Sequence, residues 1–182
     1  MEKHTSPDEL PALKEWNRIL DMPNLDWTQI LENFFKNITN NNKLIQFQYK
    51  LLMRISTCKY MRYKMKIVKD YGQCNLCNKY LETLEHIFLN CSHTKTFCEK
   101  LSNFIRNNID REFRDRKKLH FILCNHTNAT INYINLTAKW YISKSFHNSR
   151  PLIWDEYIRY IKLALNGERQ IIRVAILEVI NS

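Results

Sequence analysis

Glycine is scarce in this chain, and the shortage limits the folds that the chain can adopt. The 182 residues include two glycines, Gly72 and Gly167, and four prolines. Average usage of about 7% would supply about a dozen glycines. Sandwiches and barrels need many tight turns, and glycine is a residue that such turns favour. The shortage therefore predicts a mostly α-helical fold.

Long apolar runs are also missing. No stretch reaches the roughly 18 consecutive apolar residues of a membrane-spanning helix, and the uncharged residues 119–138 are rich in Asn, Thr and His. No basic segment followed by an apolar one opens the sequence as a secretion signal would. We therefore expect an intracellular protein without membrane contact. In a reducing compartment, clustered Cys and His residues bind metal more often than they form disulfides.

Acidic residues are absent from residues 43–69, which contain eight bases. The same segment carries aromatic rings. Basic side chains neutralise phosphates and rings stack on unpaired bases, which suits RNA or locally opened DNA. The alternative is that the rings pack in the core while the bases keep a face in solvent. The candidate nucleic-acid-binding residues are Lys43, Lys50, Arg54, Lys59, Tyr60, Arg62, Tyr63, Lys64 and Lys66.

The stretch CNLCNKYLETLEHIFLNC, residues 74–91, has the spacing C-x2-C-x8-H-x4-C. A C-x2-C pair places two thiolates on one ion at the tip of a turn, and Asn78 tolerates the left-handed conformation that such a turn needs. A short helix is then expected to deliver His86, with Cys91 just past it. The sequence predicts one Zn²⁺ on Cys74, Cys77, His86 and Cys91. Four protein ligands leave no place for a reactive water, so the ion is predicted to be structural.

Other Cys and His residues leave alternatives open. The cluster can be three free thiols and a core histidine, and His93 or Cys98 can replace His86 or Cys91 as a ligand. Cys58 and Cys124 are most simply small core residues. A second site from His120, Cys124 and His126 is less supported, because no C-x2-C pair accompanies them. If zinc binds, loss of one ligand is expected to unfold the loop and not the flanking helices.

The pattern along the chain predicts a helical domain with an inserted CCHC zinc-knuckle-like loop. We expect a loose leader over residues 1–25, a basic helical segment over 26–72, the zinc-binding loop over 73–92 and a C-terminal helical segment over 93–182. Ser92 is a predicted N-cap, and residues 106–118 are a predicted mixed-charge connection. Residues 169–180 are apolar on every side, and we favour a helix over a buried strand there.

Catalytic motifs are missing as well. The chain has no Asp-Asp pair, no Gly-rich phosphate loop and no G-x-S-x-G segment. Polymerase chemistry needs clustered carboxylates that hold two metal ions. We infer that the chain is not an enzyme on its own, although it can be part of a larger one.

The loop and its surroundings resemble the zinc-binding region that follows the reverse transcriptase domain in non-LTR (LINE-type) retrotransposon proteins. The matching pieces are QFQYKLLMRI, the loop itself, KTFCEKL, LHFILC and NLTAKWYISKSF, within residues 27–160. The chain departs from that pattern at Phe97-Cys98, where the family usually has an aromatic pair, and at Asn78, where it often has Gly.

This resemblance implies a non-catalytic module that engages template RNA or target DNA, with a reverse transcriptase domain in the same chain or in another one. It also implies a nuclear location. The alternative is a co-opted, transposon-derived structural or protein-interaction module whose zinc only stabilises a helical scaffold.

Overall fold

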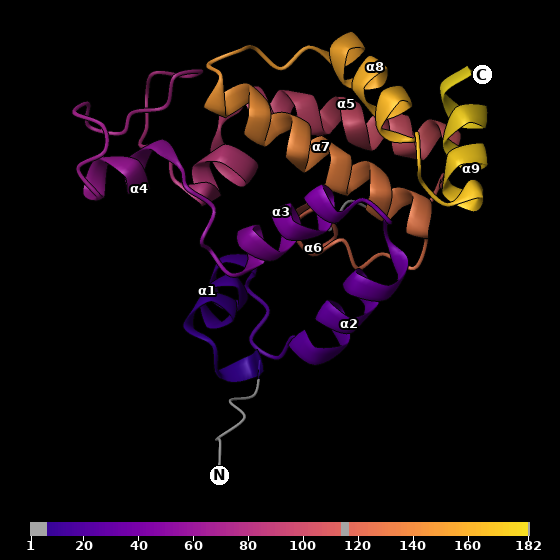
Figure 1. Ribbon diagram of the computed structural model, residues 1–182, viewed down its shortest axis with the longest axis horizontal. Helices are drawn as coiled ribbons and strands as arrows, with labels where there is room; N and C mark the ends of the chain where they lie inside the picture. The colour runs from indigo at the N-terminus through magenta and orange to yellow at the C-terminus, as the bar shows by residue number, and fades with distance from the viewer. Residues whose placement is uncertain (1–6, 114–116, 182) are drawn as a thin grey trace.

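The computed structural model describes residues 7–113 and 117–181, and its regular elements are helices (Figure 1). The one β-pairing in these ranges is an antiparallel bridge between Gln73 and Leu81. The predicted mostly α-helical fold with an inserted Cys/His loop is therefore confirmed. In chain order the elements are η1 (Pro7–Glu9), α1 (Pro11–Leu20), α2 (Trp27–Asn37), α3 (Asn42–Leu52), α4 (Lys59–Lys64), η2 (His86–Asn90), α5 (Ser92–Asn108), α6 (Lys117–Leu123), α7 (Ala129–His147), α8 (Trp154–Ala164) and α9 (Gln170–Asn181).

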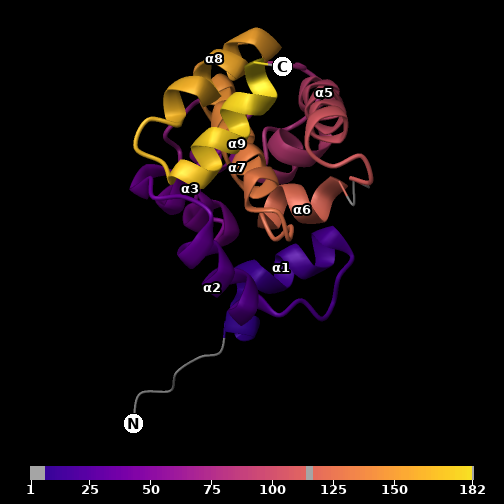
Figure 2. The same ribbon diagram turned by 90° about the vertical axis from the view of Figure 1, so that its right-hand side faces the viewer.

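Helix α7 is the centre of the fold. It contacts α3, α6, α8, α9 and η2, and Figures 1 and 2 show these elements around it. Every side chain from Thr130 to Lys139 is buried. Residues 129–138 contain no charged side chain, and a helix without a charged face is stable when neighbours cover it on all sides.

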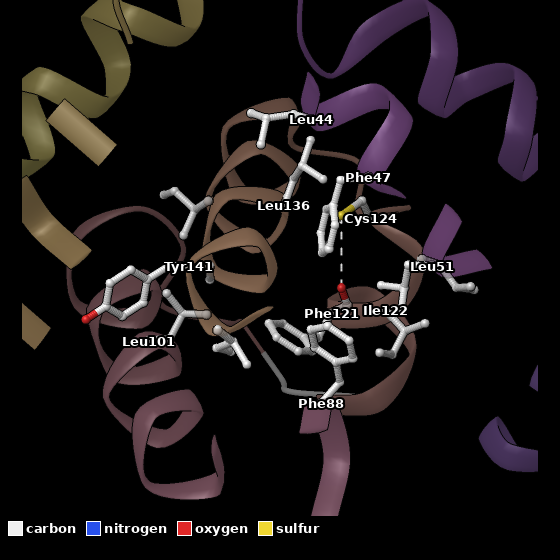
Figure 3. Packing of buried hydrophobic residues seen from close by; sticks show 14 of the residues in the cluster. Leu44, Phe47, Leu51, Phe88, Leu101, Phe121, Ile122, Cys124, Leu136 and Tyr141 are labelled. Atoms are coloured by element: carbon white, nitrogen blue, oxygen red, sulfur yellow. Dashed lines mark hydrogen bonds between the residues drawn. The ribbon is translucent and has the colours of Figure 1, made fainter. Parts of the chain in front are cut away.

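The core fills the space between α7 and the helices on either side of the Cys/His loop (Figure 3). Phe47 of α3 packs edge-on against Trp140 of α7, with ring centroids 5.2 Å apart, and lies 6.4 Å from the ring of Phe88 in η2. Burial of each such ring contributes about 1.5–3 kcal/mol. The segments before and after the loop therefore share one core.

The expected loose leader over residues 1–25 is wrong for the segment Pro11–Leu20, which is helix α1; residues 1–6 lie outside the described ranges. Leu13 and Trp16 are completely buried, and Trp16 Nε1 donates to the carbonyl of Leu52 at 3.0 Å. Proline suits the first turn of a helix, where its missing N–H removes no helical hydrogen bond. Pro11 therefore begins this helix instead of preventing it.

The helix boundaries after the loop differ in part from the predicted ones. Helix α5 begins at Ser92 and its N-cap is Cys91, so the prediction of Ser92 as the cap is wrong. The reason is that Cys91 has an extended backbone: it ends η2 and stands directly before α5, so it takes the cap position that was predicted for Ser92. Within residues 106–118, α5 continues to Asn108 and α6 starts at Lys117, while residues 114–116 lie outside the described ranges. The predicted C-terminal helix is confirmed as α9.

Lys139 of α7 lies in the core of the protein and has no exposed surface. Its Nζ donates to Gln48 Oε1 at 2.5 Å, to the carbonyl of Ile122 at 2.7 Å and to Cys124 Sγ at 3.1 Å. Burial lowers the pKa of Lys139, and the adjacent Cys124 opposes this shift. The three contacts use all three ammonium donors and join α3, α6 and the start of the α6–α7 connection to α7.

Replacement of Lys139 by Ala is expected to lower the free energy of unfolding by about 3 kcal/mol. The change leaves a cavity and removes the donor to Gln48 Oε1 inside the core. Urea denaturation followed by tryptophan fluorescence measures the effect. Lys43→Ala, on an exposed part of α3, is the control and should change stability by less than about 0.5 kcal/mol. Equal effects of the two substitutions would contradict a structural role for the buried lysine.

Candidate metal centre and basic cleft

The first two cysteines lie at the tip of a tight hairpin. Cys74 N–H donates to the carbonyl of Tyr80, and Asn78 N–H donates to the carbonyl of Cys74, each at 2.9 Å. Asn78 has a φ of 53°, the left-handed conformation that its sequence position predicts. Cys77 N–H points to Cys74 Sγ at 3.5 Å. The hairpin therefore holds both thiols on the same side of the turn.

The other two candidate ligands come from a wide helical turn. In η2 the N–H of Cys91 donates to the carbonyl of His86 at 2.8 Å, an i→i+5 bond. Residues five apart in an α-helix point about 140° away from each other. The wider turn brings His86 and Cys91 to one side, so the ordinary short helix predicted here is replaced by a π-type turn. The hydroxyl of Thr83 accepts the N–H of His86 at 3.1 Å and fixes its start.

The four predicted ligands converge on one point. One donor atom each from Cys74, Cys77, His86 and Cys91 lies within 4.8 Å of all the others. Cys77 Sγ is 3.3 Å from His86 Nε2. A tetrahedral zinc ion, about 2.3 Å from sulfur and 2.0 Å from nitrogen, separates its ligand atoms by about 3.5–3.8 Å. The cluster therefore has the donor set and the spacing to hold a metal ion.

The pKa values of the cluster predict that metal binding releases protons from its thiols. Burial raises the pKa of Cys74 to about 12 and also raises that of Cys91. Burial acts in the same direction on Cys77, but hydrogen bonds from nearby N–H groups and from the other thiols lower its pKa below the usual value. Burial lowers the pKa of His86, which keeps the imidazole neutral. A metal ion must displace the thiol protons, so its affinity falls as pH falls.

Glu82 fastens the loop to α4. Its carboxylate accepts the N–H of Lys59 at 3.1 Å, and its carbonyl accepts the N–H of Tyr60 at 3.2 Å. Its own N–H donates to the carbonyl of Gly72 at 2.8 Å. At Gly72 the φ is +70°, and an added Cβ would lie 2.6 Å from the Cα of Tyr60. Only a residue without a side chain allows this approach of loop and helix.

Gly72→Ala is therefore expected to lower the free energy of unfolding of the metal-loaded protein by about 2–3 kcal/mol. Gly167→Ala is the matched control, because Gly167 also has a positive φ, of +92°, but nothing lies within 4 Å of its added Cβ. Its cost should be the backbone strain of about 1–2 kcal/mol. Thermal unfolding measures the stability of both variants, and the extra loss in Gly72→Ala is the cost of the clash with Tyr60. Equal losses of stability would show that the close approach to Tyr60 is unimportant.

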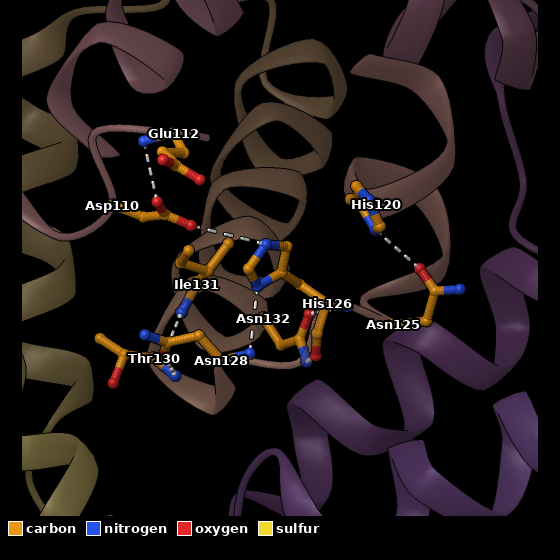
Figure 4. A network of polar contacts seen from close by, with 9 residues as sticks. All are labelled: Asp110, Glu112, His120, Asn125, His126, Asn128, Thr130, Ile131 and Asn132. Atoms are coloured by element: carbon orange, nitrogen blue, oxygen red, sulfur yellow. Dashed lines mark hydrogen bonds and ion pairs between the residues drawn. The ribbon is translucent and has the colours of Figure 1, made fainter. Parts of the chain in front are cut away.

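The alternative ligands do not join the cluster. Within the described ranges, the metal-ligating group contains neither His93 nor Cys98, and no second group forms. His120 Nδ1 lies 3.1 Å from Asn125 Oδ1, and His126 Nδ1 accepts the N–H of Asn128 at 3.0 Å (Figure 4). Cys58 and Cys124 are buried, as predicted for core residues.

A cleft of about 500 Å³ lies between the C-terminal end of α3, α4, the loop and α7. We call it the basic cleft, because its lining includes four Lys or Arg side chains, one His and one Trp. Glu82 is the one acidic residue in the described lining, and its carboxylate caps the start of α4. The basic and aromatic members are Lys50, Lys59, Arg62, Lys144, His147, Trp140 and Phe146.

The nine predicted nucleic-acid-binding residues fall into three groups in the structure. Lys50, Lys59 and Arg62 line the basic cleft. Arg54 instead pairs with Glu85 and lies 5.2 Å from the centroid of the Trp16 ring, so it joins the loop to α1. The others lie outside the described lining of the cleft and are Lys43, Tyr60, Tyr63, Lys64 and Lys66. Their contact with nucleic acid stays a prediction.

Three cleft residues were missed by the sequence patterns. Trp140, Lys144 and His147 recur at i, i+4 and i+7, so they share one face of α7. Lys144 Nζ lies 4.8 Å from the centroid of the Trp140 ring. The spacing is visible in KWYISKSFH, residues 139–147, but the candidate nucleic-acid-binding residues were all taken from the basic segment 43–69. The cleft thus joins two segments about 90 residues apart in the chain.

The described helices include none with both the length and the apolar character needed to cross a membrane. The resemblance to the post-polymerase region of LINE-type proteins stays a prediction carried by the quoted residues, because comparisons with protein-family models, curated proteins and solved structures give no match.

Proposed function

We propose that the Cys/His cluster binds one structural Zn²⁺. Three thiols and one imidazole form a donor set that zinc favours and that hard ions such as Mg²⁺ and Ca²⁺ do not. Four protein ligands fill a tetrahedral ion and leave no place for a reactive water. The ion would therefore stabilise the loop and take no part in hydrolysis.

We propose further that the chain is a non-catalytic nucleic-acid-binding module, and the basic cleft is the observation that carries this proposal. Lys50 from α3, Arg62 from α4 and Lys144 from α7 meet there from separate parts of the chain. The half-buried Trp140 adds an aromatic surface to the same wall. Cations next to an aromatic ring suit a strand with unpaired bases, in RNA or in opened DNA.

The metal loop supports the cleft through Asn75. Its Oδ1 accepts from Lys59 Nζ at 2.5 Å, and its Nδ2 donates to Ser149 Oγ at 2.6 Å, just past the end of α7. The loop thus joins both walls at one end of the cleft. In this proposal zinc keeps the walls at a fixed separation. From the resemblance to LINE-type proteins we further propose that the ligand is template RNA or target DNA. The partner would be a reverse transcriptase domain in the same chain or in another one.

The test is the affinity of the zinc-loaded chain for a structured RNA, a single strand and a DNA duplex across a salt series. Three phosphate contacts predict a log–log slope of about −2 for single strands and about −2.7 for a duplex. Tight binding with such a slope would support the module. Weak binding that does not respond to salt would contradict nucleic-acid binding.

A second candidate function is a protein-interaction module, and exposed apolar residues on α8 and α9 favour it. Leu163 is 70% exposed, Ile171 81% and Val174 45%. An interface with a protein through such residues would depend little on salt. The salt series therefore distinguishes the two functions.

A further inference from the structure

Two tyrosine rings stack on each other at the surface beside α4. Tyr63 lies near the C-terminal end of α4, and Tyr71 lies in the connection from α4 to the Cys/His hairpin. Figure 1 shows α4 and its flanking connections projecting from the helices around α7. The ring centroids are 5.2 Å apart and the ring planes differ by 24°. Tyr71 is 77% exposed, so its ring has one face against Tyr63 and the other face open to solvent.

The backbone on both sides of Tyr71 is held in place although its ring is exposed. Asp70 Oδ2 lies 2.7 Å from Lys59 Nζ in an ion pair. Gly72 packs against the backbone of Tyr60, and its N–H donates to the carbonyl of Asp70 at 2.7 Å. An aromatic side chain on a fixed backbone has only two side-chain angles to order when a ligand binds, so the entropy cost of binding is small.

The surroundings of the two rings are positively charged. Lys64, Lys66 and Lys69 are exposed, and each lies within three residues of one of the rings in the chain. Asp70 is the one acidic residue of residues 43–81, and Lys59 pairs with it. An unpaired base offers a flat ring, and the phosphates on either side of it offer negative charge. The surface therefore fits a nucleic-acid strand better than an apolar peptide.

The two rings are joined to the basic cleft through α4. Lys59 lines the cleft and pairs with Asp70, the residue before Tyr71. Arg62 also lines the cleft, and Tyr63 follows it directly in the chain. A strand whose phosphates meet Lys59 and Arg62 can therefore place its next unpaired base on the open face of Tyr71.

We propose that Tyr71 stacks on an unpaired base of the strand bound in the basic cleft, and that this contact makes the protein prefer single strands to duplexes. The bases of a duplex are already stacked and paired, so they offer no face to Tyr71 unless the duplex opens at a cost in free energy. This inference rests on the proposed nucleic-acid binding and narrows its ligand to strands with unpaired bases.

The experiment measures the affinity of the zinc-loaded full chain for single-stranded oligothymidylate and for a DNA duplex across a salt series. Tyr71→Leu is expected to weaken single-strand binding about tenfold at every salt concentration and to leave the salt slope unchanged, because a stacked base is lost and no phosphate contact is. Tyr71→Phe keeps the ring and should retain the original affinity. Duplex affinity should be the same in all three proteins.

A photocrosslink tests the same contact without a substitution. A single strand that carries 5-iodouracil is expected to crosslink to Tyr71 of the unsubstituted chain, and mass spectrometry of the peptides locates the attachment. Unchanged single-strand affinity in Tyr71→Leu, or attachment to Trp140 and not to Tyr71, would overturn this inference and leave the proposed function in place. If the unsubstituted chain binds neither the single strand nor the duplex, the proposed function fails and this inference fails with it.

Discussion

Removal of zinc with a chelator is expected to unfold the hairpin from Gly72 to Leu81 and to leave much of the helical signal in place. Structural zinc sites contribute on the order of 10 kcal/mol or more of folding free energy. The hairpin has few other interactions of that size, since Tyr71, Tyr80 and Leu81 are exposed. Amide NMR signals of the loop should collapse while those of α7 persist, and circular dichroism should change little.

Cys91→Ser is expected to weaken zinc binding by about a hundredfold or more, because loss of a thiolate ligand costs more than the roughly 10–100-fold loss seen when a residue that only hydrogen-bonds a ligand is changed. Cys98→Ser is the matched control: the same substitution seven residues later, outside the cluster. Competition with a chromophoric chelator measures both affinities. An equal loss in the two variants would show that the ligand set is wrong.

Loss of the cations that line the basic cleft is expected to weaken nucleic-acid binding strongly. The triple variant Lys50→Ala, Arg62→Ala and Lys144→Ala should weaken binding to structured RNA by about two orders of magnitude at physiological salt. The log–log salt slope should become shallower by about 2, because three phosphate contacts are lost. Fluorescence anisotropy across a salt series measures both quantities.

The control for that variant removes the same charge elsewhere. Lys14→Ala, Arg159→Ala and Arg173→Ala change three exposed cations that neither line the cleft nor belong to the predicted nucleic-acid-binding residues. Their combined loss should weaken binding less than about tenfold, through the reduced overall positive charge. If both triple variants lose affinity equally, binding depends on net charge and not on the basic cleft.

The Cys/His cluster could be predicted almost completely from the sequence because its determinants are local. Cys74 and Cys77 lie in one turn, and Asn78 takes the left-handed conformation expected of it. What the pattern did not reveal is the wide turn at His86, because an i→i+5 bond and an ordinary helical turn use similar residues. The four Cys and His residues that were predicted to lie together do lie together, although the local backbone differs from the prediction.

The remaining differences arise where one segment depends on another. Pro7 and Pro11 suggest a loose leader when the N-terminal segment is considered alone. Trp16 becomes a core residue only because α3 offers the carbonyl of Leu52 and a surface to cover. Arg54 belongs to a basic run in the sequence, but Glu85, 31 residues later, pairs with it. The sequence next to Trp16 does not contain Leu52, and the sequence next to Arg54 does not contain Glu85, so a local pattern cannot reveal either contact.

Composition and short spacings were sufficient to predict the helical class, the Cys/His cluster and the excess of positive charge. Which charged side chains line the basic cleft depends on how distant helices pack together, and the local sequence does not show it. It places Lys144 opposite Lys50 and Arg62, and it buries Lys139, five residues before Lys144, among three acceptors. The physical reason is that a helix face acquires its role from what packs against it, and those neighbours come from distant parts of the chain.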